Sequence, residues 1–163
     1  MPIRPSHNNK TCVLLVTAQA DLAAQVSRAL GIVWLEPMIR QCTAVEQIPY
    51  ALPRAGLRDT GFDLALVDLS LPGTDGCEAV TATRRRTSAS GAGIVAVAAA
   101  PVSPAAECRL LGAGADLVVS AGDLLPRLPE IVSLVVDNWM SIDCPICRGV
   151  APDCRSRHGH RLN

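Results

Sequence analysis

The stretch LALVDLSLPGTDG, residues 64–76, decides the fold. Its first four residues are apolar, and Asp68 ends this apolar run. A turn that contains Pro72 and Gly73 follows, and a helix is predicted to begin at Asp75. A short apolar run bounded by turn residues is typical of a strand that is buried on both faces, as in a parallel sheet. Open α/β sheets bind ligands at the carboxyl ends of their strands. The stretch therefore predicts a central strand with a candidate functional carboxylate at its tip.

Segments on both sides of this stretch alternate between the same strand pattern and helical spacing. Apolar runs predict further strands over 12–16, 38–42, 93–98 and 116–119. Apolar spacing and capping residues predict helices over 21–30, 44–52, 75–86, 104–111 and 124–139, the first with Asp21 as its N-cap. Five strand–helix units in succession predict an α/β fold of the doubly wound (βα)5 flavodoxin-like type, with a parallel five-stranded sheet covered by helices on both faces.

Composition and charge favour one globular domain and argue against several classes of function. Of the 163 residues, 49% are apolar and 18% are charged, which is typical of a folded domain. The formal net charge is zero, so the chain has no overall basic footprint for nucleic acid. No apolar run approaches the roughly 18–20 residues of a membrane span. Since no secretory signal is recognisable at the N-terminus, we expect a cytoplasmic protein with no membrane association.

Three parts are expected along the chain. Residues 1–10 are polar and predict a flexible lead, residues 11–139 form the domain, and residues 140–163 form a tail rich in Cys, His and Arg.

The domain resembles the receiver domain of response regulators, a phosphorelay module of two-component signal transduction. The resemblance covers about residues 11–138 and matches Asp68 to the aspartate that accepts the phosphoryl group. In that family two acidic residues after the first strand help to hold Mg²⁺. A Ser or Thr after the fourth strand and a Lys after the fifth contact the phosphoryl group, and an aromatic switch residue lies three positions before the Lys.

This chain departs from the family at every one of these positions except Asp68. The matching residues are Thr17 and Ala18 for the acidic pair, Ala98 for the hydroxyl, Ser120 for the lysine and Leu117 for the aromatic residue. Because Mg²⁺ prefers hard oxygen ligands and neutralises the transferring phosphoryl group, the resemblance implies a pseudo-receiver with a degenerate site, with no cofactor in its pocket. Asp68 keeps three interpretations, namely a structural acceptor, a slow phosphoacceptor, or a contact for a partner or ligand.

The resulting hypothesis is an atypical receiver-like signalling domain that acts through protein–protein interaction, independently of aspartate phosphorylation. In the family, the fourth helix, fifth strand and fifth helix often form a contact face, which implies a homodimer or docking surface over 104–111, 116–119 and 124–136. A histidine kinase is another partner that the resemblance implies. Two alternatives stay open: a working single-domain response regulator phosphorylated on Asp68, or a zinc- or redox-sensing module that uses the tail.

Enzymatic and DNA-binding roles are not expected. The sequence contains no P-loop, GxGxxG or GxSxG motif, and its three histidines, His7, His158 and His160, all lie in the predicted lead and tail. Too few residues follow the last predicted helix for a DNA-binding effector domain.

The tail carries a candidate zinc site. Cys144, Cys147, Cys154 and His158 have the spacing C-x2-C-x6-C-x3-H, which supplies the thiolate and imidazole ligands of a tetrahedral zinc ion. A basic tail with incidental cysteines and a redox-active C-x2-C pair are the alternatives. The other four cysteines, Cys12, Cys42, Cys77 and Cys108, lie in or beside apolar segments and are expected to be buried thiols.

Metal analysis distinguishes these alternatives. If the tail binds zinc, the purified chain retains one zinc ion per molecule, and the double variant Cys144→Ser/Cys147→Ser loses it because two of four ligands are gone. The control variant Cys108→Ser keeps the metal. A wild-type chain that retains no zinc after purification in zinc-supplemented buffer excludes the site.

Overall fold

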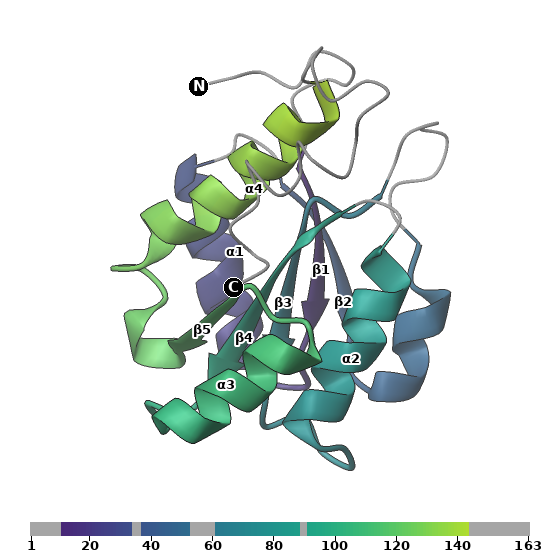
Figure 1. The fold of residues 1–163 in the computed structure, drawn as a ribbon, viewed down its shortest axis with the longest axis vertical. Coiled ribbons are helices and arrows are strands. Elements are labelled where there is room, and N and C mark those ends of the chain that lie inside the picture. Colours follow the sequence, from purple (N-terminus) through teal and green to yellow (C-terminus); the bar gives the residue numbers. More distant parts are fainter. Residues whose placement is uncertain (1–10, 34–36, 53–60, 89–90, 144–163) are drawn as a thin grey trace.

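The computed structural model describes residues 11–33, 37–52, 61–88 and 91–143, with side chains as far as residue 135. Five parallel strands form one sheet in the order β2-β1-β3-β4-β5 (Figure 1). The strands are β1 (Cys12–Val16), β2 (Met38–Cys42), β3 (Leu64–Asp68), β4 (Gly93–Ala98) and β5 (Leu117–Ser120). The helices are α1 (Ala20–Val33), η1 (Val45–Tyr50), α2 (Gly76–Thr87), α3 (Pro104–Ala113), η2 (Ala121–Asp123) and α4 (Leu128–Asp143). The predicted doubly wound flavodoxin-like fold is confirmed.

Helices cover both faces of the sheet, because side chains alternate between the two faces along each strand. In β3, Leu64 and Leu66 belong to a core cluster with α1 and α4, whereas Ala65 and Val67 belong to a second cluster with η1, α2 and α3. Figure 1 shows the same two layers, with α1 and α4 on one side of the sheet and α2 and α3 on the other. All five residues of β3 are buried, as expected for the central strand.

Several predicted elements differ from the observed ones. The predicted helix over 44–52 is a short 3₁₀ helix, η1, since Pro49 has no N–H to continue an α-helical ladder. The last helix begins at Leu128 and not at residue 124, because Pro126 and Pro129 interrupt the same ladder. The predicted fourth and fifth helices are therefore α3 and α4. Asp21 is not the N-cap of α1, since the helix already begins at Ala20 and Asp21 lies in its first turn.

The four cysteines of the domain are thiols, but not all of them are buried. Cys12 and Cys42 are buried as predicted, and burial raises the pKa of the Cys42 thiol, an effect that Arg86 partly opposes. Cys77 is half-buried and Cys108 is exposed on α3. The prediction was wrong for Cys108 because α3 turns only Leu110 fully into the core.

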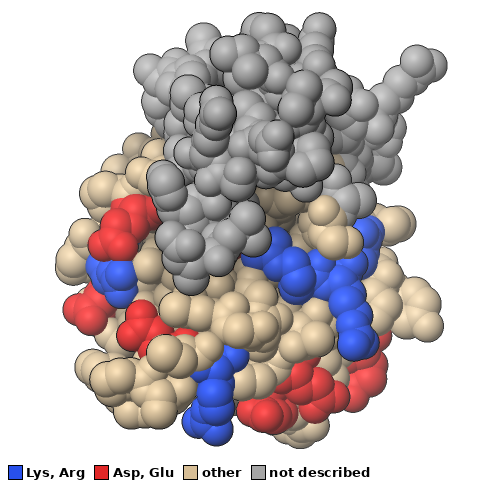
Figure 2. Space-filling view, in the orientation of Figure 1, with Lys and Arg blue, Asp and Glu red and all other residues tan. Residues whose placement is uncertain are grey.

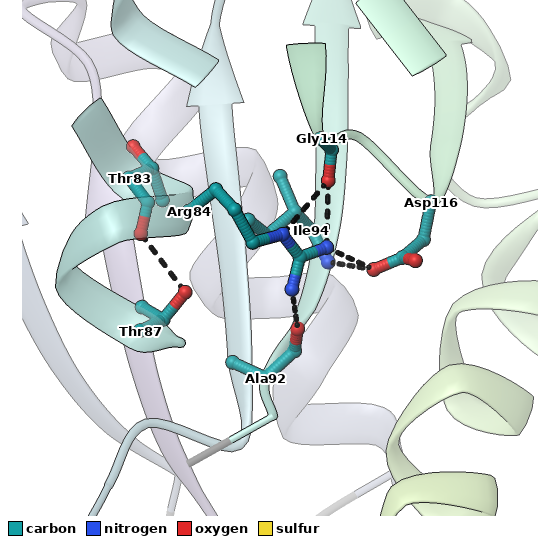
Figure 3. A network of polar contacts seen from close by, with 7 residues as sticks. All are labelled: Thr83, Arg84, Thr87, Ala92, Ile94, Gly114 and Asp116. Atoms are coloured by element: carbon teal, nitrogen blue, oxygen red, sulfur yellow. Dashed lines mark hydrogen bonds and ion pairs between the residues drawn. The ribbon is translucent and has the colours of Figure 1, made fainter. Parts of the chain in front are cut away.

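The amino ends of β4 and β5 are joined to α2 by the side chain of Arg84 (Figure 3). Its guanidinium donates to the carbonyl oxygen of Gly114 at 2.6 and 3.1 Å and to that of Ala92 at 3.2 Å. It also pairs with the Asp116 carboxylate at 2.9 Å, and the same carboxylate oxygen accepts from the Ile94 N–H at 2.8 Å. One side chain thus ties a helix to the starts of two strands, at the sheet edge opposite Asp68.

Gly114 makes this contact possible. Its φ of +124° is rarely adopted by residues with a side chain, and a Cβ there would lie 3.0 Å from the Cβ of Arg84. The glycine therefore both ends α3 and lets Arg84 approach the backbone.

The described surface mixes charges of both signs. In the view of Figure 2, basic and acidic side chains are interspersed among uncharged areas, in agreement with the net charge of zero. Among the described helices, none has the length and apolar character needed to cross a bilayer.

Candidate functional site

Asp68 lies where the sequence predicted it, at the carboxyl end of the central strand β3. The residue is 2% exposed. Thr17 follows the end of the neighbouring strand β1 and is fully buried, so its hydroxyl faces the Asp68 carboxylate from the side. The site is therefore built from the ends of two adjacent central strands and the loop after β3.

Both carboxylate oxygens of Asp68 accept hydrogen bonds from neighbouring residues. The Thr17 hydroxyl donates to Oδ2 at 2.7 Å. The Ser70 backbone N–H and hydroxyl donate to Oδ1 at 2.9 and 2.6 Å. Three donors to one carboxylate satisfy a buried charge that would otherwise be costly.

These bonds form part of a closed ring of four residues, which we call the Asp68 ring: Thr17, Gln19, Ser70 and Asp68. The Gln19 side-chain amide donates to the Ser70 hydroxyl at 2.8 Å, and the Gln19 backbone N–H donates to the Thr17 hydroxyl at 3.0 Å. Each hydroxyl therefore donates to Asp68 and accepts from Gln19. The ring fixes the loops after β1 and β3 against each other.

None of the other positions that the family resemblance singled out contributes a charged group to this ring. Ala98 ends β4 and lines the same hollow as Asp68, and Ala18 is an exposed residue of the loop after β1. The Ser120 hydroxyl donates to the exposed Asp123 carboxylate at 2.8 Å, within the turn that follows β5. Leu117 packs against the core cluster that contains α1 and α4.

A shallow hollow of about 260 Å³ opens beside the ring. It is lined by Gln19, Asp21, Leu22, Gln25, Asp68, Ser70, Val97, Ala98, Ala99 and Ala121. None of these described lining residues is basic, so the hollow offers no cation to pair with a phosphoryl oxygen. Its lining combines apolar side chains with five polar ones, of which Gln19, Asp68 and Ser70 already bond within the Asp68 ring.

The ring does not suit a magnesium ion. The Thr17 hydroxyl uses its proton on Asp68, and Asp21 is the only other acid of the hollow, on an exposed turn of α1. Within the described residues, no three side chains of His, Cys, Asp or Glu come together in a way that could hold a metal ion. Mg²⁺ prefers several hard oxygen ligands in an octahedron, and among the described residues that line the hollow only Asp68 and Asp21 supply carboxylates.

Ser70 and Gln19 are the ring members that sequence reasoning did not single out. For Ser70 a signal existed, because an Asp followed two residues later by Ser is a common local pair that closes a turn. Gln19 gave no such signal, since its partner Ser70 is distant in the sequence. The candidate zinc ligands Cys144, Cys147, Cys154 and His158 lie outside the described residues.

Comparison with known proteins supports the fold. No protein-family model matches the chain, and no curated protein sequence matches it. A CheY-like response-regulator receiver domain protein from Methanospirillum hungatei JF-1 is similar in structure, with 18% identity, a TM-score of 0.57 and coverage of 78% of this chain and 95% of that one. Chemotaxis protein CheY4 of Vibrio cholerae is 19% identical, with a TM-score of 0.58 and coverage of 75% and 98%.

A third similar structure carries the modification that is in question here. It is a response regulator from Burkholderia pseudomallei with a phosphorylated aspartic acid and a calcium ion, 14% identical, with a TM-score of 0.58 and coverage of 87% of this chain and 75% of that one. At these low identities the likeness shows a shared fold.

Proposed function

We propose that this chain, which has the fold of response-regulator receiver domains, is a signalling module that acts by protein–protein contact and without phosphorylation of Asp68. The Asp68 ring is the observation that carries the proposal. Asp68 accepts three hydrogen bonds, from Thr17 and Ser70, which hold its carboxylate between two loops. No basic side chain lines the described hollow beside it to pair with a phosphoryl group. The carboxylate serves here to join two loops.

The electrostatics of the site support the same proposal. In a cluster of acids, like charges repel and a bound cation relieves the repulsion. Thr17 replaces that repulsion with a hydrogen bond, so the site gains little from Mg²⁺. Without a cation, phosphotransfer loses several kcal/mol of transition-state stabilisation. The proposal also includes a cytoplasmic location and no catalytic activity of its own.

The partner surface that we propose is the face formed by α3, β5 and α4, in the position where the family commonly makes contacts. Glu107, Cys108 and Arg109 are exposed on α3. A histidine kinase or another protein of the pathway is the proposed partner for this face.

A labelling experiment tests the proposal. After incubation with acetyl phosphate and Mg²⁺, or with beryllofluoride and Mg²⁺, we expect no change in the intact mass or in the thermal unfolding temperature. A receiver domain that is modified under the same conditions serves as the positive control. A mass increase of one phosphoryl group that disappears in Asp68→Ala would show instead that the chain is a working response regulator.

A gain-of-function variant gives the matched control. Thr17→Asp replaces the donor of the ring with a second carboxylate next to Asp68, so we expect the variant to be less stable than wild type and to recover stability when Mg²⁺ is added. Wild type should show no such Mg²⁺ dependence.

A further inference from the structure

The exposed side of α1 is unusual for a helix on a protein surface. Between Ala20 and Ile32 its exposed residues include only two charges, Asp21 and Arg28, both without an ion-pair partner among the described residues. Ile32 is 73% exposed. A solvated helix face normally carries many charged side chains, so this one has the composition of a contact surface.

The exposed residues fall into two parallel stripes. At about 100° per residue, Asp21, Gln25, Arg28 and Ile32 lie within about 60° of one another, and we call them the charged stripe. Ala20, Ala24, Ser27 and Gly31 lie about a quarter turn away and form the small stripe. No atom lies within 4 Å of a Cβ built on Gly31, so this part of the helix is open to a neighbour.

We infer that this side of α1 is the interface of a symmetric dimer, in which the α1 helices of two copies of this chain pack antiparallel. In such a pair each stripe faces its own copy across the twofold axis. Asp21 and Arg28 are two turns apart, about 10 Å along the axis. The charged stripe is therefore self-complementary, because Asp21 of each copy faces Arg28 of the other.

The remaining residues of the two stripes fit this arrangement. Gln25 lies near the twofold axis, where two amides donate to and accept from each other. The small stripe allows the two helices to approach closely. Pairing residue 21 with residue 28 also places Ile32 of each copy beyond the amino end of the other α1, over the hollow that Ala98 and Ala99 line.

A groove beside the charged stripe supplies further apolar contact area. It has a volume of about 430 Å³ and lies between α1 and the turn after β5, with Ile32 and Leu125 on its walls. These are two of the four large apolar side chains that are exposed in the described structure. Burial of both in the dimer removes apolar surface from water.

Charge reversal tests the pairing sharply, because every substitution occurs twice across the axis. By sedimentation velocity over a concentration series with reductant present, we expect wild type to form dimers. Asp21→Arg and Arg28→Asp should each raise the dimer dissociation constant at least about tenfold, since each variant places like charges opposite each other. The double variant Asp21→Arg/Arg28→Asp should restore dimers.

Mixing the two single variants gives the most specific result. The chain with Asp21→Arg has Arg at both positions and the chain with Arg28→Asp has Asp at both, so a heterodimer satisfies both contacts while neither homodimer does. A one-to-one mixture should therefore dimerise, and more weakly at high salt. Arg109→Asp, on the exposed side of α3, is the matched control that leaves dimerisation unchanged, and circular dichroism confirms that each variant is folded.

Three results would overturn the inference: a monomeric wild type at all concentrations, single variants that dimerise as wild type does, or a mixture that stays monomeric. Loss of the dimer in Arg109→Asp but not in Arg28→Asp would place the interface on the α3, β5 and α4 face. The inference does not depend on the proposed function, because none of these measurements involves phosphorylation of Asp68.

Discussion

Replacement of Asp68 by Ala should destabilise the protein by about 2–4 kcal/mol, measured as the free energy of unfolding in urea. The substitution leaves three donors without their acceptor, namely the hydroxyls of Thr17 and Ser70 and the Ser70 N–H. The Thr17 hydroxyl is fully buried, so water cannot simply replace the carboxylate. Asp68→Asn should cost far less, because an amide oxygen still accepts from Ser70 and the Thr17 hydroxyl can accept from the amide nitrogen.

Asp75 provides a matched control for this loss. It is also an aspartate after β3, but it caps α2 with one hydrogen bond to the Cys77 N–H at 3.3 Å, so Asp75→Ala should cost about 1 kcal/mol. An Asp68→Ala variant that is more stable than wild type would contradict the structural role, since removal of an acid from a repulsive functional site commonly stabilises a protein.

Replacement of Arg84 by Met should destabilise the protein by about 2–4 kcal/mol. The Asp116 carboxylate is 3% exposed and loses its cation, while the carbonyl oxygens of Gly114 and Ala92 lose their donors. Arg84 itself is 30% exposed, which keeps the expected cost below that of a fully buried pair. Arg84→Lys should lie in between, because one ammonium group cannot reach all three acceptors.

Arg85→Met is the control for Arg84→Met. Arg85 is the next residue of α2 and is exposed, and its side chain makes no hydrogen bond or ion pair within the described residues, so its replacement should change stability by at most about 0.5 kcal/mol. Equal effects of the two substitutions would show that Arg84 contributes through helix propensity or net charge and not through the contacts in Figure 3.

The sheet was predictable because most of its strands are short, nearly continuous apolar runs. A parallel strand that is buried on both faces typically has this sequence pattern. Leu64–Asp68 and Gly93–Ala98 lie at their predicted positions for this reason. The segment of η1 was predicted as a helix but not as a 3₁₀ helix, because apolar spacing alone does not distinguish a short 3₁₀ helix from a short α-helix. The predicted start of α4 was four residues too early, because the prediction followed the apolar spacing from residue 124 onward and gave too little weight to Pro126.

The candidate site was predictable only in part. Sequence order placed Thr17 and Asp68 at neighbouring strand ends, but not the hydrogen bond between them, which depends on side-chain rotamers. The role of Arg84 could not be distinguished from that of Arg85 and Arg86, because three consecutive arginines carry no signal of which one faces the sheet edge. Only the packing of α2 on the sheet decides that.

The closed ring around Asp68 has a consequence for how a cell would regulate this protein. A receiver that is switched by a phosphoryl group needs two arrangements of similar free energy, and a ring with all its donors satisfied favours a single one. If the chain signals without phosphorylation, as proposed, its activity would be set by how much of it the cell contains. Its output would follow the amounts of the chain and of its binding partner by mass action, so synthesis and degradation would set the signal.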